Sequence, residues 1–223
     1  MTAKPRVGFG GKRGLFWVLM ASWLVPVMMT GAYIVLIATS EVDATGAAWE
    51  AIAFAFVIVL WIIFRVLTEH AGMTRAVDIG DADRVLELAD FQLARRRRAR
   101  RRAPYHVYRA LAFDMRGEWA EALAELDKCQ PRGHWRTLAA TVRVSALAET
   151  GRAADARSVF DTELSSPPRD PQLAILTRLA EAHLRRAEGD EPAAHALLAK
   201  LADNVRAGSG IRARARALLL ARA

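Results

Sequence analysis

Two long apolar stretches in the first third of the chain constrain its organisation more than any other feature. The first covers residues 15–39 and the second covers residues 47–67, and no ionisable side chain lies deep in either one. A bilayer core about 30 Å thick is crossed by roughly 20 apolar residues of helix. Hydrocarbon also offers no partners to backbone amides, so a crossing segment must be helical. The sequence therefore predicts a two-span transmembrane hairpin over residues 15–67.

Charges on either side of the stretches predict an orientation for this hairpin. The tail of residues 1–14 is basic, whereas the hinge between the stretches carries Glu41 and Asp43. By the positive-inside rule we expect a multi-pass protein of the inner (cytoplasmic) membrane, with both termini in the cytoplasm. The single cysteine, Cys129, fits a reducing compartment. A cleaved signal peptide is the alternative interpretation of the first stretch, which is longer than a signal-peptide core.

Small residues recur in the second stretch at the spacing of one helix face. Ala47, Ala51 and Ala55 lie four residues apart. Such a seam lets two helices pack closely in a membrane, so we expect it to contact the first span. The alternative is that alanine serves here only as a good helix former.

The remaining part of the chain, about 150 residues, is large enough to form a core of its own. It is rich in Ala, Leu and Arg and has almost none of the apolar and polar alternation of strands. We therefore expect an all-α domain. The net charge of +8 favours an anionic partner, without choosing between lipid, nucleic acid and an acidic protein.

A repeat is visible within this part. Residues 109–123 recur in altered form as residues 143–157, which places Gly117 and Gly151 34 residues apart. Small or apolar residues hold equivalent positions around each glycine, and further units surround Gly189 and, in degenerate form, Gly80. The matched pairs are Ala110 and Val144, Phe113 and Leu147, Ala122 and Ala156, and Leu126 and Phe160.

This pattern resembles the tetratricopeptide repeat family, whose period is 34 residues. The resemblance covers residues 73–205 and implies an α-solenoid of antiparallel helix pairs. It divides the domain into a degenerate unit with an arginine-rich helix end at 68–104, clearer repeats at 105–205 and a capping helix at 206–223. A membrane-surface anchor is the alternative interpretation of the last segment.

An arginine run is the strongest local signal after the two stretches. Seven guanidinium groups occupy eight positions, and we expect them to contact anionic lipid near a membrane surface. A solvated charge run and a nucleic-acid site are the alternatives; the second is disfavoured because no aromatics are interleaved for base stacking. The residues are Arg95, Arg96, Arg97, Arg98, Arg100, Arg101 and Arg102.

Motifs of catalysis are missing from the sequence. The five histidines lack the spacing of a zinc hydrolase helix, and residues 8–13 lack the full pattern of a phosphate loop. We therefore expect no catalytic, cofactor or metal site, and no enzyme.

The function predicted from these features is a membrane-anchored scaffold that presents a docking surface near anionic lipid for another protein. The arginines of this surface favour an acidic partner segment. The first helix of each pair would line the groove, and ordinary helix surface is the alternative interpretation of each candidate. The candidates are Tyr105, Tyr108, Arg109, Met115, Arg136, Arg143 and Arg178. The alternative function is a structural subunit or assembly factor held in a larger membrane complex by the predicted spans.

Overall fold

The computed structural model describes residues 55–61 and 71–221 of the chain. The chain divides into two compact units, Met1–His70 and Ala71–Ala223, and each is considered by itself. In the first unit, residues 55–61 are helical. The second unit begins with a helical segment at 71–79, and its further helices are α3 (Ala82–Arg95), α4 (Ala99–Arg116), α5 (Trp119–Leu126), α6 (His134–Glu149), α7 (Ala153–Glu163), α8 (Pro171–Ala187), α9 (Glu191–Ala202) and α10 (Ser209–Leu220). The described residues contain helices and no strand, which confirms the predicted all-α class for this part of the chain.

The predicted multi-pass localisation in the inner membrane is contradicted. Within residues 55–61 and 71–221, no helix is both long and apolar enough to cross a bilayer. The longest described helix, α4, begins with arginines, whose burial in hydrocarbon is costly. The predicted spans at 15–39 and 47–67 lie outside the described residues except for 55–61, and so do the tail at 1–14 and the seam residues Ala47 and Ala51. The third seam residue, Ala55, is exposed.

One turn geometry repeats through the second unit. The helices before Gly80, Gly117, Gly151 and Gly189 all end at a glycine with a φ between 77° and 83°. At Gly117 the glycine N–H donates to the Asp114 carbonyl, and the next N–H donates to the carbonyl of Phe113. The other three turns bond in the same way. This is the Schellman arrangement, and it needs a residue without a Cβ because left-handed φ is strained for other residues.

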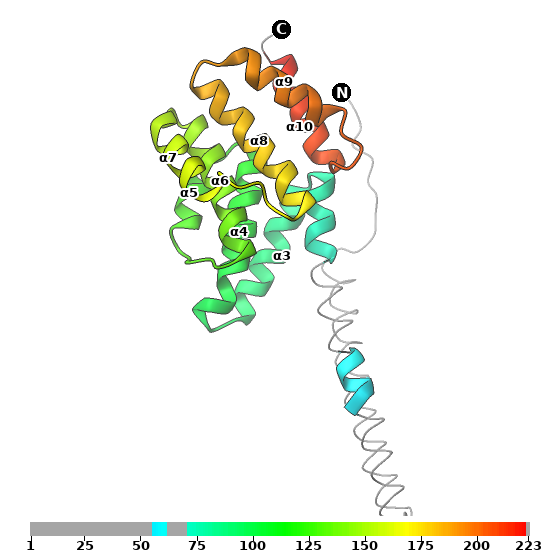
Figure 1. Ribbon diagram of the computed structural model, residues 1–223. Coiled ribbons are helices and arrows are strands. Elements are labelled where there is room, and N and C mark those ends of the chain that lie inside the picture. Colours follow the sequence, from blue (N-terminus) through cyan, green and yellow to red (C-terminus); the bar gives the residue numbers. More distant parts are fainter. Residues whose placement is uncertain (1–54, 62–70, 222–223) are drawn as a thin grey trace, which may run out of the picture. The chain divides into compact units, whose positions relative to one another are not determined.

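These turns fold the chain into consecutive antiparallel helix pairs (Figure 1). The segment 71–79 pairs with α3, α4 with α5, α6 with α7, and α8 with α9. The first helices of the pairs also contact one another, because α6 packs against both α4 and α8. Alanines such as Ala110, Ala122 and Ala156 are fully buried where two helices approach closely. Helix α6 is central and buries ten of its 16 residues.

The C-terminal helix brings the two ends of this unit together. Helix α10 packs against α8 and α9, where Ile211 and Ala215 are buried. Just before it, the backbone of Gly208 and Gly210 lies against the turn at Asp78 to Gly80. The Ser209 hydroxyl donates to the carbonyl of Asp78 at 3.4 Å. We call this contact of residues 208–210 with residues 78–80 the end junction.

Substitution at the end junction should destabilise the fold. A Cβ built on Gly210 would lie 2.4 Å from the Gly80 nitrogen, so Gly210→Ala forces the two backbones apart. We expect a loss of about 2 kcal/mol, in the range of overpacking mutations, measured by urea unfolding followed by circular dichroism.

The matched control for this substitution is Gly72→Ala. Gly72 lies in a helix with the nearest side-chain atom 4.0 Å from a built Cβ, so alanine should leave stability unchanged or raise it slightly. Equal stability of Gly210→Ala and the wild type would contradict the close approach at the end junction.

Candidate protein-docking surfaces

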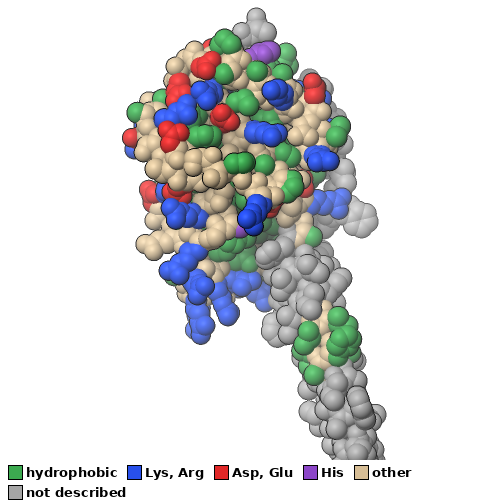
Figure 2. Space-filling view, viewed as in Figure 1, with side chains coloured by type: hydrophobic (Ala, Val, Ile, Leu, Met, Phe, Trp, Pro, Cys, Tyr) green, Lys and Arg blue, Asp and Glu red, His purple; other side chains and the backbone are tan. Residues whose placement is uncertain are grey.

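A cluster of arginines covers the tip where α3 turns into α4. We call residues 95–102 the arginine tip; it projects from the lower end of the folded unit as a group of basic side chains (Figure 2). Two members lie against aromatic rings: the Arg95 guanidinium is 5.1 Å from the ring centre of Phe91, and that of Arg96 is 5.1 Å from the ring of Tyr105. No acidic residue occurs between positions 91 and 113. The segment that forms the tip therefore contains seven arginines and no acidic residue of its own.

The start of α4 departs from the usual chemistry of a helix N-terminus. Its N-cap residue, Arg98, makes no side-chain capping bond, and its first turn has no acidic residue. Basic side chains oppose the positive end of the helix dipole. By contrast, Asp81, Asp170 and Asp190 cap α3, α8 and α9 with their carboxylates. The arginine tip thus places positive charge at the N-terminus of a helix, where it is unfavourable.

A second basic feature is a pocket of about 360 Å³ between the α5–α6 connection, α6 and α7. Its walls include Arg132, Arg136 and Arg143, and Ala139 and Ala140 of α6 form part of its apolar lining. Arg136 and Arg143 lie seven residues apart, which is two helical turns, so α6 presents both on one face. We call this feature the arginine pocket.

The guanidinium groups of this pocket have only weak partners. Arg136 Nε donates to Glu163 at 3.0 Å, and Arg143 Nη2 donates to Asp127 at 3.2 Å. The Arg136 side chain is 67% exposed and that of Arg143 is 37% exposed. Exposed ion pairs of this kind are worth about 0–1 kcal/mol. A carboxylate from another molecule can therefore replace them at little cost.

Cys129 also lines the arginine pocket but is not activated there. Burial raises the pKa of its thiol, and nearby Glu125 acts in the same direction. The thiol donates to the Leu126 carbonyl at 3.4 Å. Because the thiolate is the reactive form of cysteine, this environment lowers the reactivity of Cys129.

The predicted groove residues are dispersed by the fold. Tyr105 is buried, Tyr108 meets Trp135 edge to face with ring centres 5.1 Å apart, and Met115 packs against the core. Arg109 lies between Asp90 and the buried Glu125, while Arg178 is exposed on α8. Of the seven candidates, the structure brings only Arg136 and Arg143 together around one hollow. The role of the other five, and the contact of the arginine tip with lipid, stay predictions.

A buried acid–base network that the sequence did not reveal connects α4 to α5. Glu125 accepts from His106 Nδ1 and from Lys128 Nζ, both at 2.7 Å. Burial alone would raise the pKa of Glu125, but these two hydrogen bonds and the charge of Arg109 hold it below its usual value. The carboxylate is therefore ionised and anchors the second helix pair.

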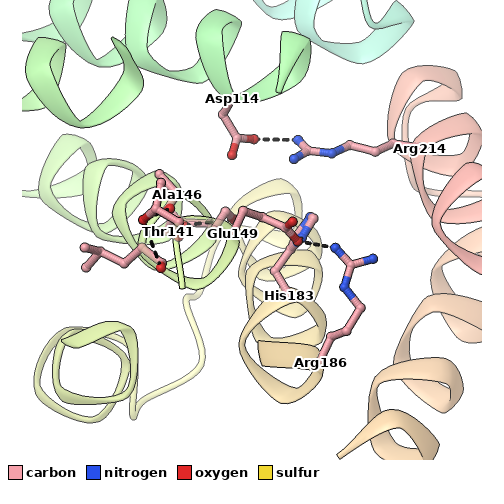
Figure 3. A network of polar contacts seen from close by, with 10 residues as sticks. Asp114, Thr141, Ala146, Glu149, His183, Arg186 and Arg214 are labelled. Carbon is pink, nitrogen blue, oxygen red and sulfur yellow. Dashed lines mark hydrogen bonds and ion pairs between the residues drawn. The ribbon is translucent and has the colours of Figure 1, made fainter. Parts of the chain in front are cut away.

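A second network joins α6 to α8 and is shown in Figure 3. The Nδ1 of His183 lies 2.5 Å from Glu149 Oε1, and Arg186 binds the same oxygen. Burial opposes ionisation of Glu149, yet the hydrogen bond from His183 and the adjacent Arg186 lower its pKa to about 2. Burial also lowers the pKa of His183, so the neutral ring donates from Nδ1 to an ionised carboxylate. A signal existed in the sequence, because the two residues lie 34 positions apart, one repeat length.

The comparisons with known proteins identify no relative. The chain matches no protein-family model, and searches of curated proteins and of solved structures find no similar chain. Within the part of the chain that the structure describes, no group of three metal-ligating side chains is placed to hold an ion. The function must therefore be argued from the surfaces above.

Correcting the cap of α4 should stabilise the protein. In Arg98→Asp, the new carboxylate would accept hydrogen bonds from N–H groups of the first turn. Its negative charge would also interact favourably with the positive end of the helix dipole. We expect a gain of about 1 kcal/mol in the free energy of unfolding, measured by urea titration. Arg178→Asp, which makes the same charge change on the exposed surface of α8, is the control; an equal gain there would show that only net charge matters.

The network around His183 should make the fold sensitive to acid in two steps. Because the pKa of His183 is below 6.5, the unfolded chain binds the proton more readily, and stability should fall as pH drops below 6.5. The contribution of Glu149 is present above pH 4.5 and is lost as pH falls toward about 2. In His183→Asn the amide can still donate to Glu149, so only the first step should disappear from the dependence of the melting temperature on pH. A variant profile parallel to the wild type between pH 6.5 and 4.5 would refute this assignment.

Proposed function

We propose that this chain is a non-enzymatic adaptor of the tetratricopeptide type, which binds an acidic segment of another protein in the arginine pocket. The observation that supports this proposal best is the placement of Arg132, Arg136 and Arg143 around one hollow of peptide-side-chain size. Stacked helix pairs commonly serve as rigid supports for such extended docking surfaces. The proposed likeness to the tetratricopeptide family is supported by the 34-residue spacing and the repeated glycine turns.

Arginine suits this role because its planar guanidinium group can bind a carboxylate through two parallel hydrogen bonds. Arg136 binds Glu163 and Arg143 binds Asp127, each through one hydrogen bond. An incoming Asp or Glu side chain would replace a weak, exposed ion pair of the arginine with a more enclosed ion pair. The apolar lining at Leu126 and Ala139 would accept the stem of that side chain.

The arginine tip supports the same partner chemistry at longer range. Exposed charges of one sign raise association rates with an oppositely charged partner, and the effect weakens as salt screens it. The pocket would supply the short-range contacts, whereas the tip would supply attraction during encounter. Binding of an acidic partner should therefore become slower and weaker as ionic strength rises.

The test uses a fluorescein-labelled peptide of eight residues rich in Asp and Glu. We expect the full chain to raise its fluorescence anisotropy, and Arg136→Gln combined with Arg143→Gln to weaken binding at least tenfold. That loss corresponds to about 1.4 kcal/mol, within the range for charge-assisted hydrogen bonds.

The control is Arg152→Gln combined with Arg169→Gln, which removes the same charge from exposed positions that do not line the pocket. If both double variants weaken binding equally, the effect is one of net charge and the pocket is not the site. Absence of binding by the wild-type chain at low salt would refute the proposed function.

A further inference from the structure

Arg214, on the C-terminal helix α10, contacts residues of the earlier helices α4 and α5. Arg214 of α10 donates from Nη1 to Asp114 Oδ2 of α4 at 2.5 Å, across 100 positions of sequence (Figure 3). Its guanidinium group also lies 5.2 Å from the ring centre of Trp119, at the start of α5. Trp119 in turn meets His183 of α8 with ring centres 5.9 Å apart. The Arg214 side chain thus packs against residues of α4 and α5, and these contact α8. We call the surface formed by Asp114, Trp119 and His183 the α10-binding surface.

The receiving residues are buried, yet their hydrogen bonding is incomplete. Asp114 is 4% exposed and His183 is 2% exposed. Among the described residues, Asp114 Oδ1, His183 Nε2 and Arg214 Nη2 are buried without a hydrogen-bond partner. A buried polar atom without a hydrogen-bond partner is destabilising, because it has lost its bonds to water. Helix α10 therefore forms hydrogen bonds with only some of the polar atoms that it covers.

The rest of α10 holds to the fold by a small apolar contact. Of its 12 residues only Ile211 and Ala215 are buried, Leu218 and Leu219 are partly buried, and Leu220 is 75% exposed. Helix α6, by comparison, buries ten residues. Elements with few buried contacts open at lower free energy than the rest of a fold. Helix α10 is accordingly held by fewer buried residues than α4, α6 or α8.

We propose that the α10-binding surface is a docking site for an arginine-bearing amphipathic helix of a partner protein, and that α10 is its resident occupant. A partner arginine that pairs with both oxygens of Asp114 would satisfy the acceptor that Arg214 leaves open. A second donor on the same helix would satisfy His183 Nε2. The chemistry of this partner is opposite to that of the acidic segment proposed for the arginine pocket, so the two sites take different ligands.

The probe for this proposal is a labelled synthetic peptide with the sequence of residues 206–221, which carries the resident helix. We expect the full chain with Arg214→Ala to bind it at least tenfold more tightly than the wild type, whose own α10 competes. Adding Asp114→Asn to Arg214→Ala should remove that gain. A peptide with lysine in place of Arg214 should also bind more weakly, because a point charge cannot pair with two oxygens.

A second variant that should release α10 controls for the case in which Arg214→Ala misfolds. Gly210→Ala separates the end junction without altering Arg214 or Asp114, and it should also increase peptide binding. In the wild type, excess peptide should accelerate hydrogen exchange in residues 209–220 and leave α6 protected. The proposal is overturned if neither variant binds more tightly than the wild type, or if Asp114→Asn has no effect. These outcomes are independent of the acidic-peptide experiment, which probes the arginine pocket.

Discussion

The left-handed glycine turn is the constraint on which the helical stack depends. At Gly117 and Gly151 the chain reverses direction within two residues, and the same two backbone hydrogen bonds close each turn. A fixed turn sets the angle at which the second helix returns, so the alanines that follow always meet the preceding helix. Close approach at Ala122 and Ala156 then leaves no room for larger side chains. Repetition of one local geometry thus produces a continuous core from units that could not bury their own apolar faces alone.

Charge is distributed in this fold by two different rules. Inside, carboxylates such as Glu125 and Glu149 are matched to histidine, lysine or arginine and tie neighbouring helices together. Outside, the arginine tip has no acidic residue within its own segment, and its basic side chains oppose the dipole of α4. The interior networks have evident structural consequences. In the tip, Arg95 and Arg96 lie against aromatic rings, and the exposed basic surfaces are the more informative guides to function.

The sequence predicted the helical repeat, but it did not predict which residues of the repeat are buried. Periodic glycines and alanines identified the helix pairs because each feature acts within about 34 residues. The same reasoning expected Tyr105 and Tyr108 to be available to a partner, whereas the fold covers the first and packs the second against Trp135. It also treated the histidines as scattered. Which side of a helix faces a neighbour depends on how successive pairs rotate, and no local pattern encodes that rotation directly.

By itself, the sequence determined the all-helical class of the described part, the positions of the turns and the concentration of arginine at one helix end. These follow from propensity, left-handed glycine and local charge, all of which act over short distances. Only the tertiary structure decided that Arg136 and Arg143 share one hollow, and that Gly210 meets Gly80. It alone placed Arg214 against Asp114, 100 positions away. Such contacts arise from the summed geometry of several helix pairs, so a pairing at this range leaves no periodic trace in the chain.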